Sequence, residues 1–379
     1  MNRRDFARKV TALSLATSPL ARILGANDRI RMGFIGVGGM GTADLQYFLR
    51  TGQVDVVAIA DPYGPHLEAA VGLTSGQARG YKDFRQVLDL KDIDAVAIAT
   101  PDHWHAIPTI MACEAGKDVF VEKPLSHTLH EGRAIVQAAQ KHDRVVQVGT
   151  QQRSAAHFQK AVELLRSGKI GRVTSVETWL LSRRPVSGFG NPPDTDPPQS
   201  LDWDLWLGPA PYHVYNPNRC IQNFRWFWDY SNGMLTDWGV HLIDVVHWAM
   251  GVEAPRTVSF AGGKYVVQDN TETPDTFDVT YEYPASAASG KEFLLRFHCR
   301  LTNDHADQGS EPWHRILWNR WHASGEPGRL HLVAGAAGIE GQSDPIGGGR
   351  FGQPLVAALC SRAEFSRLRP VAPEAEFGR

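Results

Sequence analysis

Short apolar runs and segments of helical periodicity alternate through the first 150 residues of the chain. Five runs rich in Val, Ile and Ala predict buried strands over 31–37, 54–60, 95–100, 118–123 and 145–149. The segments between them predict helices over 42–49, 67–73, 84–88, 104–115 and 129–141. Regular alternation of strand and helix at this short spacing predicts an α/β domain with a doubly wound parallel sheet.

The pattern changes after about residue 150, and this change predicts a second domain of the α+β type. Apolar positions at helical spacing predict helices over 157–167 and 235–250, and the run 173–181 predicts a strand. Residues 277–283 alternate strictly between apolar and polar, as an antiparallel strand with one exposed face does, and 293–299 predicts its neighbour. We therefore expect an open, mainly antiparallel sheet in this domain.

After about Thr302 the apolar residues follow neither the spacing of a strand nor that of a helix. Residues 304–349 are rich in Gly, His, Arg and Trp without the spacing of a strand or a helix. Unstructured loops of this length are uncommon in compact domains. We therefore treat 304–379 as an atypical part of the second domain.

Length, charge and cysteine content narrow the possible classes of protein. A chain of 379 residues predicts two domains, here 29–150 and 151–379. A net charge of −2 gives no basic surface for nucleic acid, and no apolar run is long enough to span a bilayer. The four cysteines lie far apart in the sequence, which argues against a zinc ribbon and leaves at most isolated disulfides: Cys113, Cys220, Cys299 and Cys360.

The first 28 residues have the character of an export signal. The basic stretch that begins with Arg3 and Arg4 precedes a short apolar segment from Val10 to Ala21. The pair of arginines followed by Asp5 and Phe6 resembles the core of a twin-arginine signal. We expect residues 1–28 to direct export to the periplasm. The alternative is a helical or disordered tail, in which case the protein stays in the cytoplasm.

A glycine-rich turn follows the first predicted strand and opens the first helix. Its spacing is Gly-x-Gly-x-x-Gly, and the turn comprises Gly36, Val37, Gly38, Gly39, Met40 and Gly41. This pattern in a strand–turn–helix context predicts a site for the pyrophosphate of a dinucleotide. Asp61 ends the second strand, where a carboxylate accepts hydrogen bonds from ribose hydroxyls and repels a 2′-phosphate. We expect NAD rather than NADP, and flavin is the main alternative.

Three residues further along are candidates for acid–base chemistry. Lys123 ends the fourth predicted strand, and the carboxyl ends of such strands face the reactive part of the cofactor. Asp237 and His241 lie four residues apart and share one helix face, so the carboxylate can orient the imidazole. The alternatives are a surface lysine, an N-terminal helix cap and a core histidine.

Two further clusters of residues have more than one interpretation. The residues His103, His105, His241, Asp244 and His247 do not match a standard metal-binding spacing, and we expect no metal site. An aromatic cluster is either ordinary core or a wall that stacks on sugar rings: Trp203, Trp206, Trp226, Phe227, Trp228 and Tyr230.

Together these motifs resemble the Gfo/Idh/MocA oxidoreductases over about residues 29–300. The resemblance rests on the glycine turn, Ala60-Asp61-Pro62, Ala99 to His105, Glu122-Lys123-Pro124-Leu125, and Gly233-x-x-x-Asp237-x-x-x-His241. It implies an N-terminal Rossmann domain, a C-terminal sheet that lines the substrate cleft and often joins subunits, and NAD-dependent redox chemistry at a sugar or cyclitol hydroxyl. A homo-oligomer, either a dimer or a tetramer, follows from the same resemblance.

The resemblance also assigns roles to individual residues. Lys123, Asp237 and His241 match the catalytic positions, with His241 as the acid–base and Lys123 assisting. The cofactor and substrate cleft would be lined by Thr100, Pro101, His105, Glu122 and Gln151. Arg153 lies in the motif of the exported branch of the family, and we expect it to contact the substrate together with Trp206 and Tyr230 of the aromatic cluster.

Three functions remain open from the sequence. The first is an NAD-dependent sugar or polyol dehydrogenase, and the second is a glycosidase that oxidises its substrate transiently and recycles bound NAD. The third is a non-catalytic sugar-binding relative. The family also implies further strands and a closing helix where 304–379 shows no period. A frameshifted or degenerate C-terminal region would explain this difference.

Overall fold

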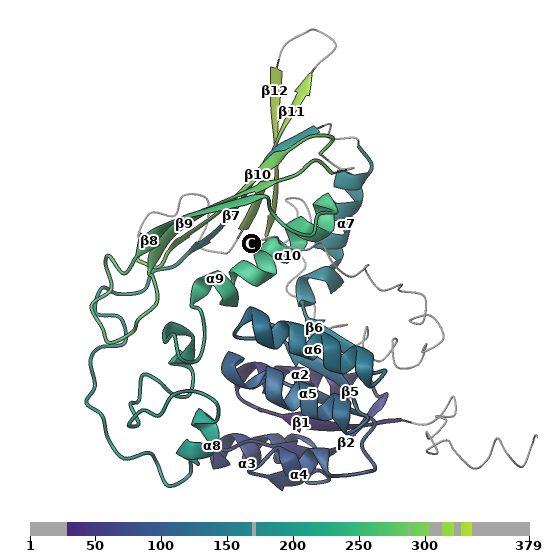
Figure 1. Ribbon diagram of the computed structural model, residues 1–379, viewed down its shortest axis with the longest axis vertical. Helices are drawn as coiled ribbons and strands as arrows, with labels where there is room; N and C mark the ends of the chain where they lie inside the picture. The colour runs from purple at the N-terminus through teal and green to yellow at the C-terminus, as the bar shows by residue number, and fades with distance from the viewer. Residues whose placement is uncertain (1–28, 169–171, 287–288, 303–312, 322–326, 336–379) are drawn as a thin grey trace, which may run out of the picture.

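The structure is a computed structural model that describes residues 29–168, 172–286, 289–302, 313–321 and 327–335. The predicted leader, residues 1–28, and most of the atypical C-terminal segment lie outside the described residues. Figure 1 shows the N-terminal domain below and the C-terminal sheet above, with the helices α9 and α10 between them.

The N-terminal domain is a doubly wound parallel sheet, as predicted. Its strand order is β3-β2-β1-β4-β5-β6, and every neighbouring pair is parallel. The strands are β1 Ile30–Ile35, β2 Val54–Ala60, β3 Arg79–Tyr81, β4 Ala95–Ile98, β5 Asp118–Glu122 and β6 Val146–Gly149. The helices are α2 Gly39–Arg50, α3 Gly64–Leu73, α4 Arg85–Leu88, α5 Ala106–Glu114 and α6 Leu129–Lys141, and the 3-10 helices η1 Asp102–Trp104 and η2 Gln151–Ser154 flank the last strands.

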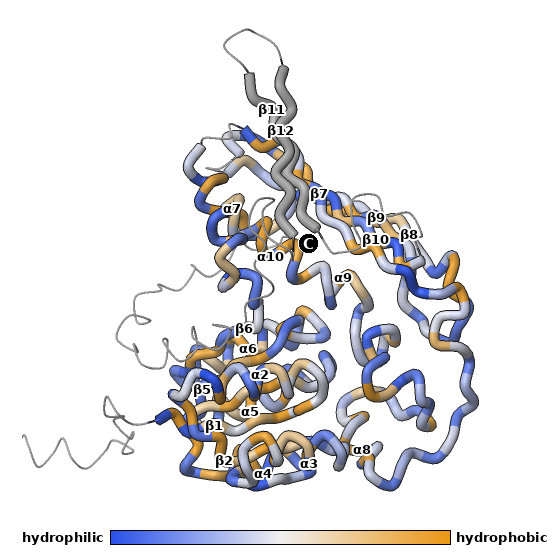
Figure 2. Tube along the Cα trace, turned by 180° about the vertical axis from the view of Figure 1, so that it is seen from behind, coloured by the Kyte–Doolittle hydropathy of each residue, from blue (hydrophilic) through white to orange (hydrophobic). Residues whose placement is uncertain are grey.

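Apolar side chains on both faces of this sheet form its core, because helices cover each face. Met32 and Phe34 of β1 pack with Leu45 and Phe48 of α2 on one face. Ile35 belongs to the cluster on the opposite face, as expected from the alternation of side chains along a strand. In Figure 2 the apolar colour follows β1, β2 and β5 through the interior of the domain. The sheet is therefore a rigid base for the loops at its carboxyl edge.

The C-terminal domain is built on a mixed sheet of order β12-β11-β7-β10-β9-β8. β7 and β10 pair in parallel, and the other neighbours are antiparallel. The strands are β7 Arg172–Leu181, β8 Thr257–Gly263, β9 Thr276–Tyr283, β10 Phe293–Arg300, β11 Trp313–Trp321 and β12 Pro327–Gly335. The helices are α7 Ala156–Arg166, α8 Trp203–Leu207, α9 Met234–Asp237 and α10 Gly239–Met250, with the 3-10 helix η3 Asn223–Trp226.

α7 and α10 cover one face of this sheet. Val162 and Leu165 of α7 and Val246 and Met250 of α10 share a core cluster with Leu295 of β10. The mainly antiparallel sheet predicted from the sequence is confirmed, including β9 and β10 as antiparallel neighbours.

Three predictions about secondary structure are corrected. The helix expected over 235–250 is two helices, α9 and α10, which meet at Trp238. The segment expected to lack a period contains β11 and β12, which extend the sheet beyond β7. The short strand β3 and the edge strand β8 were not predicted from the sequence. In the part of the chain that the structure describes, we find no helix with the length and apolar character needed to cross a membrane.

Candidate active site

The glycine turn between β1 and α2 has no room for side chains at two of its positions. Gly36 has a φ of +79°, and a Cβ there would lie 2.8 Å from the carbonyl oxygen of Ala99. A Cβ on Gly41 would lie 2.1 Å from the carbonyl oxygen of Gly36. The turn therefore brings the start of α2 against β4, as the sequence predicts for a dinucleotide loop.

The start of α2 presents backbone N–H groups to a cavity. Gly38 precedes the helix, no side chain caps it, and its first turn contains no acidic residue. Gly36, Gly38, Gly39 and Met40 line the cavity, while Gly41 packs inside. An uncapped helix start beside a glycine turn suits the negative charge of a pyrophosphate. The residues present therefore fit the NAD that the fold implies.

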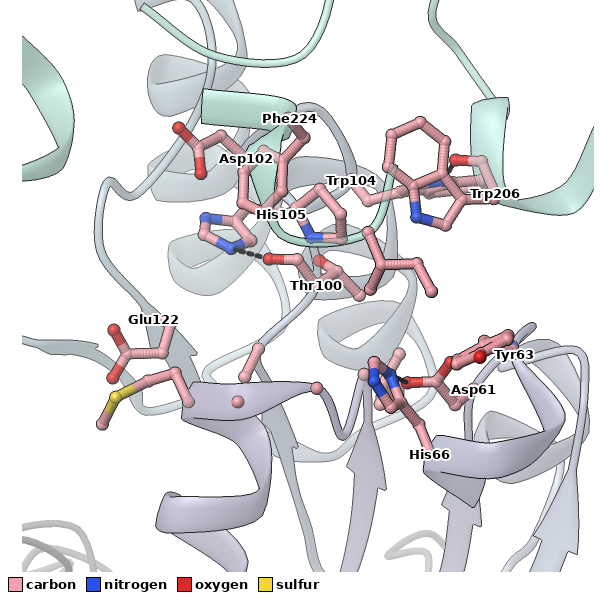
Figure 3. Close-up of a pocket in the computed structure, with 18 of the residues that line it drawn as sticks. Asp61, Tyr63, His66, Thr100, Asp102, Trp104, His105, Glu122, Trp206 and Phe224 are labelled. Atoms are coloured by element: carbon pink, nitrogen blue, oxygen red, sulfur yellow. Dashed lines mark hydrogen bonds and ion pairs between the residues drawn. The ribbon is translucent and has the colours of Figure 1, made fainter. Parts of the chain in front are cut away.

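Asp61 at the end of β2 fixes the turn and faces the same cavity. One carboxylate oxygen accepts a hydrogen bond from the Val37 N–H at 2.8 Å, and the other accepts from the Tyr63 N–H at 2.9 Å. His66 Nδ1 lies 3.8 Å from the first oxygen, as Figure 3 shows. The carboxylate is thus held by the backbone where the ribose of NAD is expected.

The cavity has a volume of about 550 Å³ and takes its lining from both domains. Asp61, Tyr63 and His66 mark one end, and Figure 3 shows Glu122 and Asp102 on the other side of the view. We call these the adenosine end and the substrate end.

At the substrate end Lys123 and Asp237 form an ion pair across the two domains. Lys123 Nζ lies 2.6 Å from Asp237 Oδ1 and donates to the Asp237 carbonyl oxygen at 3.0 Å. Arg225 Nε lies 3.2 Å from Asp237 Oδ2. Burial alone would raise the pKa of Asp237, but the charges of Lys123 and Arg225 outweigh it and hold the pKa below its usual range. Asp237 is therefore ionised near neutral pH.

His241 lies on α10, one turn after the break at Trp238, and lines the cavity with Lys123 and Asp237. Its ring packs against that of Trp238 with 5.9 Å between the centroids. The structure thus brings together the three residues predicted to be catalytic: Lys123, Asp237 and His241.

Glu122 is a buried carboxyl group next to Lys123. The side-chain amide nitrogen of Gln151 donates a hydrogen bond to the Glu122 carboxyl group. The backbone N–H of Lys123 donates a second one at 3.1 Å. Burial raises the pKa of Glu122 from 4.5 to about 7. Both Glu122 and Gln151 line the cavity, as predicted.

His105 links the loops that follow β4 and β5. Its Nε2 lies 2.8 Å from the Thr100 carbonyl oxygen, and its Nδ1 lies 2.5 Å from that of Pro124. A neutral imidazole has a single N–H, so it donates to only one of these oxygens at a time, and burial lowers the pKa of His105. Thr100, Pro101 and His105 all line the cavity, so the loops that carry them form part of its wall.

Two residues predicted to contact the substrate lie elsewhere. Tyr230 is 0% exposed inside the aromatic cluster, because the rings of His103 and Trp206 cover it. Arg153 forms two hydrogen bonds of 2.7 Å with Asp244 and is not part of the cavity wall. The structure therefore corrects the placement of both residues.

Trp206 does line the cavity, but not beside Lys123. Figure 3 shows its ring on the side of Asp61 and Tyr63, away from Glu122. The histidines considered for a metal point to separate partners: His103 Nε2 lies 3.2 Å from the Trp206 carbonyl oxygen, and His247 Nε2 lies 2.6 Å from the Tyr283 hydroxyl. Over the described ranges, no group of three or more His, Cys, Asp or Glu side chains could hold a metal ion.

Sequence reasoning missed Arg225 and Asp102. Asp102 lines the substrate end, is 6% exposed, and accepts a hydrogen bond from the Ser231 hydroxyl at 2.5 Å. Burial raises the pKa of Asp102 to about 6. Its place between Pro101 and His103 in a motif already identified was the available signal, whereas nothing in the sequence singled out Arg225.

Sequence profiles for two domains of one oxidoreductase family match this chain. The profile for the NAD-binding Rossmann fold matches residues 30–150, and the profile for the C-terminal alpha/beta domain matches residues 177–285. The chain belongs to the Gfo/Idh/MocA oxidoreductase family. The cavity of this Gfo/Idh/MocA protein therefore lies where an NAD-binding domain meets its partner domain.

Known relatives match parts of this Gfo/Idh/MocA chain. Inositol 2-dehydrogenase of Salmonella typhimurium strain LT2 is 30% identical over 145 residues, which are 38% of this chain and 43% of that protein. A glycosyl hydrolase family 109 protein of Shewanella pealeana is 35% identical over 125 residues, which are 30% of this chain and 27% of that protein. The matches thus span less than half of each of these relatives.

A solved structure has the same fold. The WlbA dehydrogenase from Chromobacterium violaceum, in complex with NADH and UDP-GlcNAcA, aligns with a TM-score of 0.61 and 22% identity. The alignment covers 82% of this chain and 75% of that one.

Proposed function

We propose that this protein is an NAD-dependent oxidoreductase that acts on a hydroxyl group of a sugar, polyol or cyclitol. One observation carries the proposal: the ion pair of 2.6 Å between Lys123 and Asp237 lies in the same cavity as the glycine turn. Similarity to an inositol 2-dehydrogenase supports a polyhydroxylated substrate. Asp61 favours NAD over NADP, because its carboxylate would repel a 2′-phosphate.

NAD⁺, when bound, supplies a hydride acceptor, and the chain's own residues handle the proton. The Lys123 ammonium group donates a hydrogen bond to the reacting hydroxyl oxygen and stabilises the negative charge that develops there. His241 takes the hydroxyl proton at its ring nitrogen as general base. Asp237, kept ionised by Lys123 and Arg225, holds Lys123 in place and accepts a hydrogen bond from a neighbouring hydroxyl.

A second candidate is a glycosidase that oxidises its substrate only transiently. The similarity to a glycosyl hydrolase family 109 protein favours it. In this reaction, oxidation of a ring carbinol to a ketone acidifies the adjacent C–H bond, and a base removes that proton. The aglycone then leaves with the bonding electrons, water adds, and return of the hydride restores the alcohol. The same lysine and histidine serve both proposals.

Turnover with a panel of sugars, polyols and aryl glycosides tests the proposal. The purified protein is supplied with NAD⁺, and NADH and free aglycone are measured in the same samples. A dehydrogenase forms NADH in proportion to oxidised product, whereas the glycosidase releases aglycone at constant NADH. If neither product forms with any member of the panel, the proposed function is rejected.

We further propose that residues 1–28 direct export through the twin-arginine route, on the basis of Arg3 and Arg4. A reporter fused to residues 1–28 should reach the periplasm, and replacement of both arginines by lysine should abolish export. Retention of the unmodified fusion in the cytoplasm would contradict this proposal.

We also propose a homo-oligomer that forms through the β8 edge of the C-terminal sheet. Val258 and Phe260 of this edge strand are exposed, and apolar side chains that cluster on a surface suit a subunit interface. Light scattering during size-exclusion chromatography should give a dimer or a tetramer, and a monomer at micromolar concentration would contradict the proposal.

A further inference from the structure

Part of the C-terminal domain crosses over to the adenosine end of the cavity. Residues 200–226, which we call the strap, leave the C-terminal sheet and pack beside α3 of the N-terminal domain, where Figure 1 shows α8 next to α3. The strap contributes Leu205, Trp206, Ile221, Gln222, Phe224 and Arg225 to the cavity wall. A segment that the sequence linked to sugar binding thus reaches the cofactor loops.

The first attachment of the strap lies directly after Asp61. Leu201 forms an antiparallel bridge with Tyr63. The Gly64 N–H donates to the Ser200 carbonyl oxygen at 2.8 Å, and the Asp202 N–H donates to the Pro62 carbonyl oxygen at 3.0 Å. The strap is therefore tied by backbone hydrogen bonds to the residues that follow the predicted ribose ligand.

The second attachment lies on η1, after β4. The Trp206 carbonyl oxygen accepts a hydrogen bond from Trp104 Nε1 at 2.9 Å. Gly208, with a φ of +51°, sits on the Trp104 ring so closely that a Cβ would lie 1.9 Å from it. The strap is thus fixed on two loops of the NAD-binding domain, one after β2 and one after β4.

The strap also has a hydrophobic core of its own. Trp203 and Trp206 stack with 5.0 Å between their ring centroids and an angle of 14°. Leu201, Leu207 and Phe224 belong to the same buried cluster, and Tyr63 packs against it. Burial of this much apolar surface holds the segment in a fixed conformation.

The position of the strap along the cavity indicates that it acts on the cofactor and not on the substrate. Trp206 lies on the same side as Asp61, Tyr63 and His66, whereas Glu122 lies on the other side (Figure 3). A dinucleotide that extends from Asp61 toward Lys123 has its adenosine half between α3 and the strap. The substrate end is bordered by β5, α9 and α10, and the strap reaches it through Arg225, which pairs with Asp237.

We propose that the strap retains the dinucleotide, so that NAD(H) leaves only when the strap detaches from Pro62–Gly64, while the substrate exchanges freely at the other end. Trp206 of the strap then belongs to the cofactor site and not to the sugar site. This inference rests on the proposed function for one point, that NAD(H) occupies the cavity.

A reversible disulfide across the first attachment tests the proposal. An ideal Cβ on Gly64 lies 3.8 Å from the Cβ of Ser200, which is within the range that disulfides span. Gly64 is not among the glycines with a positive φ, so a cysteine there needs no unusual backbone. Cys113, Cys220 and Cys299 are buried, which favours oxidation of the introduced pair. The variant is Gly64→Cys together with Ser200→Cys.

The measured quantity is the rate of NADH release. Protein loaded with NADH is oxidised, mixed with excess NAD⁺ and followed by NADH fluorescence, and the same sample is then measured after reduction. Because release requires opening of the strap, the oxidised form should release NADH at least about tenfold more slowly than the reduced form. The single variants Gly64→Cys and Ser200→Cys should show no such difference. Equal rates in the oxidised and reduced double variant overturn the proposal.

A second pair of variants tests the strap from the opposite direction. Leu201→Asp places a charge at a position that is 6% exposed and should speed NADH release by about tenfold. Tyr212→Ala changes a strap residue that is 74% exposed and outside the cavity wall, and should leave the rate unchanged. Equal release rates in these two variants also overturn the proposal. If no form of the protein binds NAD(H), the proposed function fails instead.

Discussion

The two ends of the cavity are built in different ways. At the adenosine end, the turn from Gly36 to Gly41 and Asp61 supply backbone N–H groups and one carboxylate from neighbouring stretches of sequence. At the substrate end, Asp102, Lys123 and Asp237 come from distant parts of the chain and meet as side chains. The first end depends on the local course of the backbone, and the second depends on how the domains are packed.

This difference suggests that cofactor binding depends on one end of the cavity and reaction chemistry on the other. Backbone groups bind the part of NAD that is the same in every reaction, and they change little when side chains are replaced. In the proposed function, side chains from both domains surround the reacting hydroxyl, so substitutions there should alter the chemistry without removing the cofactor. Variants that affect one end and leave the other intact test this separation.

Replacement of Lys123 should have the largest effect. Lys123→Met removes the ammonium group that lies 2.6 Å from Asp237 and that, in the proposed reaction, donates to the reacting hydroxyl oxygen, so kcat/KM should fall about a thousandfold. The affinity for NADH, measured by fluorescence titration, should change by less than about threefold, because the adenosine end is unaffected. Lys160→Met, on the exposed face of α7, is the matched control and should retain full activity. A comparable loss of NADH affinity in the Lys123 variant would show that the two ends are not separable.

The buried carboxyl of Glu122 should make stability depend on pH. Its pKa is raised from 4.5 to about 7, so the folded protein keeps a proton that the unfolded chain releases. The free energy of unfolding of the cofactor-free protein should therefore fall by on the order of 3 kcal/mol as pH rises through this window.

Glu122→Gln should flatten this dependence in urea unfolding measured from pH 4.5 to 7.5, because the amide carries no titratable proton. The smaller contribution of Asp102, whose pKa is about 6, should remain. Glu114→Gln, at the exposed end of α5, is the control and should keep the full slope. An unchanged slope in the Glu122 variant would show that its carboxyl is ionised throughout.

Asp61→Ala should weaken the adenosine end selectively. It removes the acceptor of the Val37 and Tyr63 N–H groups together with the expected ribose ligand. The affinity for NADH should fall about ten- to a hundredfold, while the affinity for NADPH should hold or increase. Asp55→Ala, on the same strand and paired with Arg29 at the surface, should leave both affinities unchanged. Parallel loss of NADH and NADPH binding would contradict the assignment of Asp61 to cofactor selection.

Arg153→Ala should have the smallest effect. Its bidentate pair with Asp244 is partly exposed, so the free energy of unfolding should fall by no more than about 1 kcal/mol. The KM for the substrate should change by less than about twofold, since Arg153 is not part of the cavity wall. A tenfold increase in KM would restore the substrate contact predicted from the sequence.

The sequence predicted those parts of the fold that depend on local pattern. All parallel strands of the N-terminal sheet except β3 were predicted, because each is a run of apolar residues that a short window contains. The helix α6, with its capping box at Thr128, and the alternating strand β9 were predicted for the same reason. β8 was missed because its alternation covers only the four residues from Thr257 to Phe260 before the sequence continues into two glycines. The break at Trp238 was missed because apolar residues continue through it.

Among the residues of the site, too, only those with a local sequence motif could be predicted. The glycine turn, Asp61 and Lys123 have motifs next to predicted strand ends, and their positions could be predicted. Arg225 joins the site only because η3 and α9 come together, and no spacing between Arg225 and Asp237 signals that contact. Tyr230 lies in the core and Trp206 lines the cavity on the side of Asp61, and the sequence could not distinguish these places, because an aromatic residue looks the same in a sequence whether it faces a sugar, a cofactor or the core.

The position of β7 in its sheet bears on the order in which the chain folds. Its neighbours are β10 and β11, and Leu294 of β10 pairs with Ser175 of β7. β7 therefore cannot pair with β10 until more than about a hundred further residues have been synthesised. The NAD-binding sheet, in contrast, is complete once β6 has been synthesised. A fragment of residues 29–150 should bind NAD(H) by itself, and failure to bind would exclude this order. The nascent chain thus completes its cofactor-binding half first, and the later half packs against a sheet that is already complete.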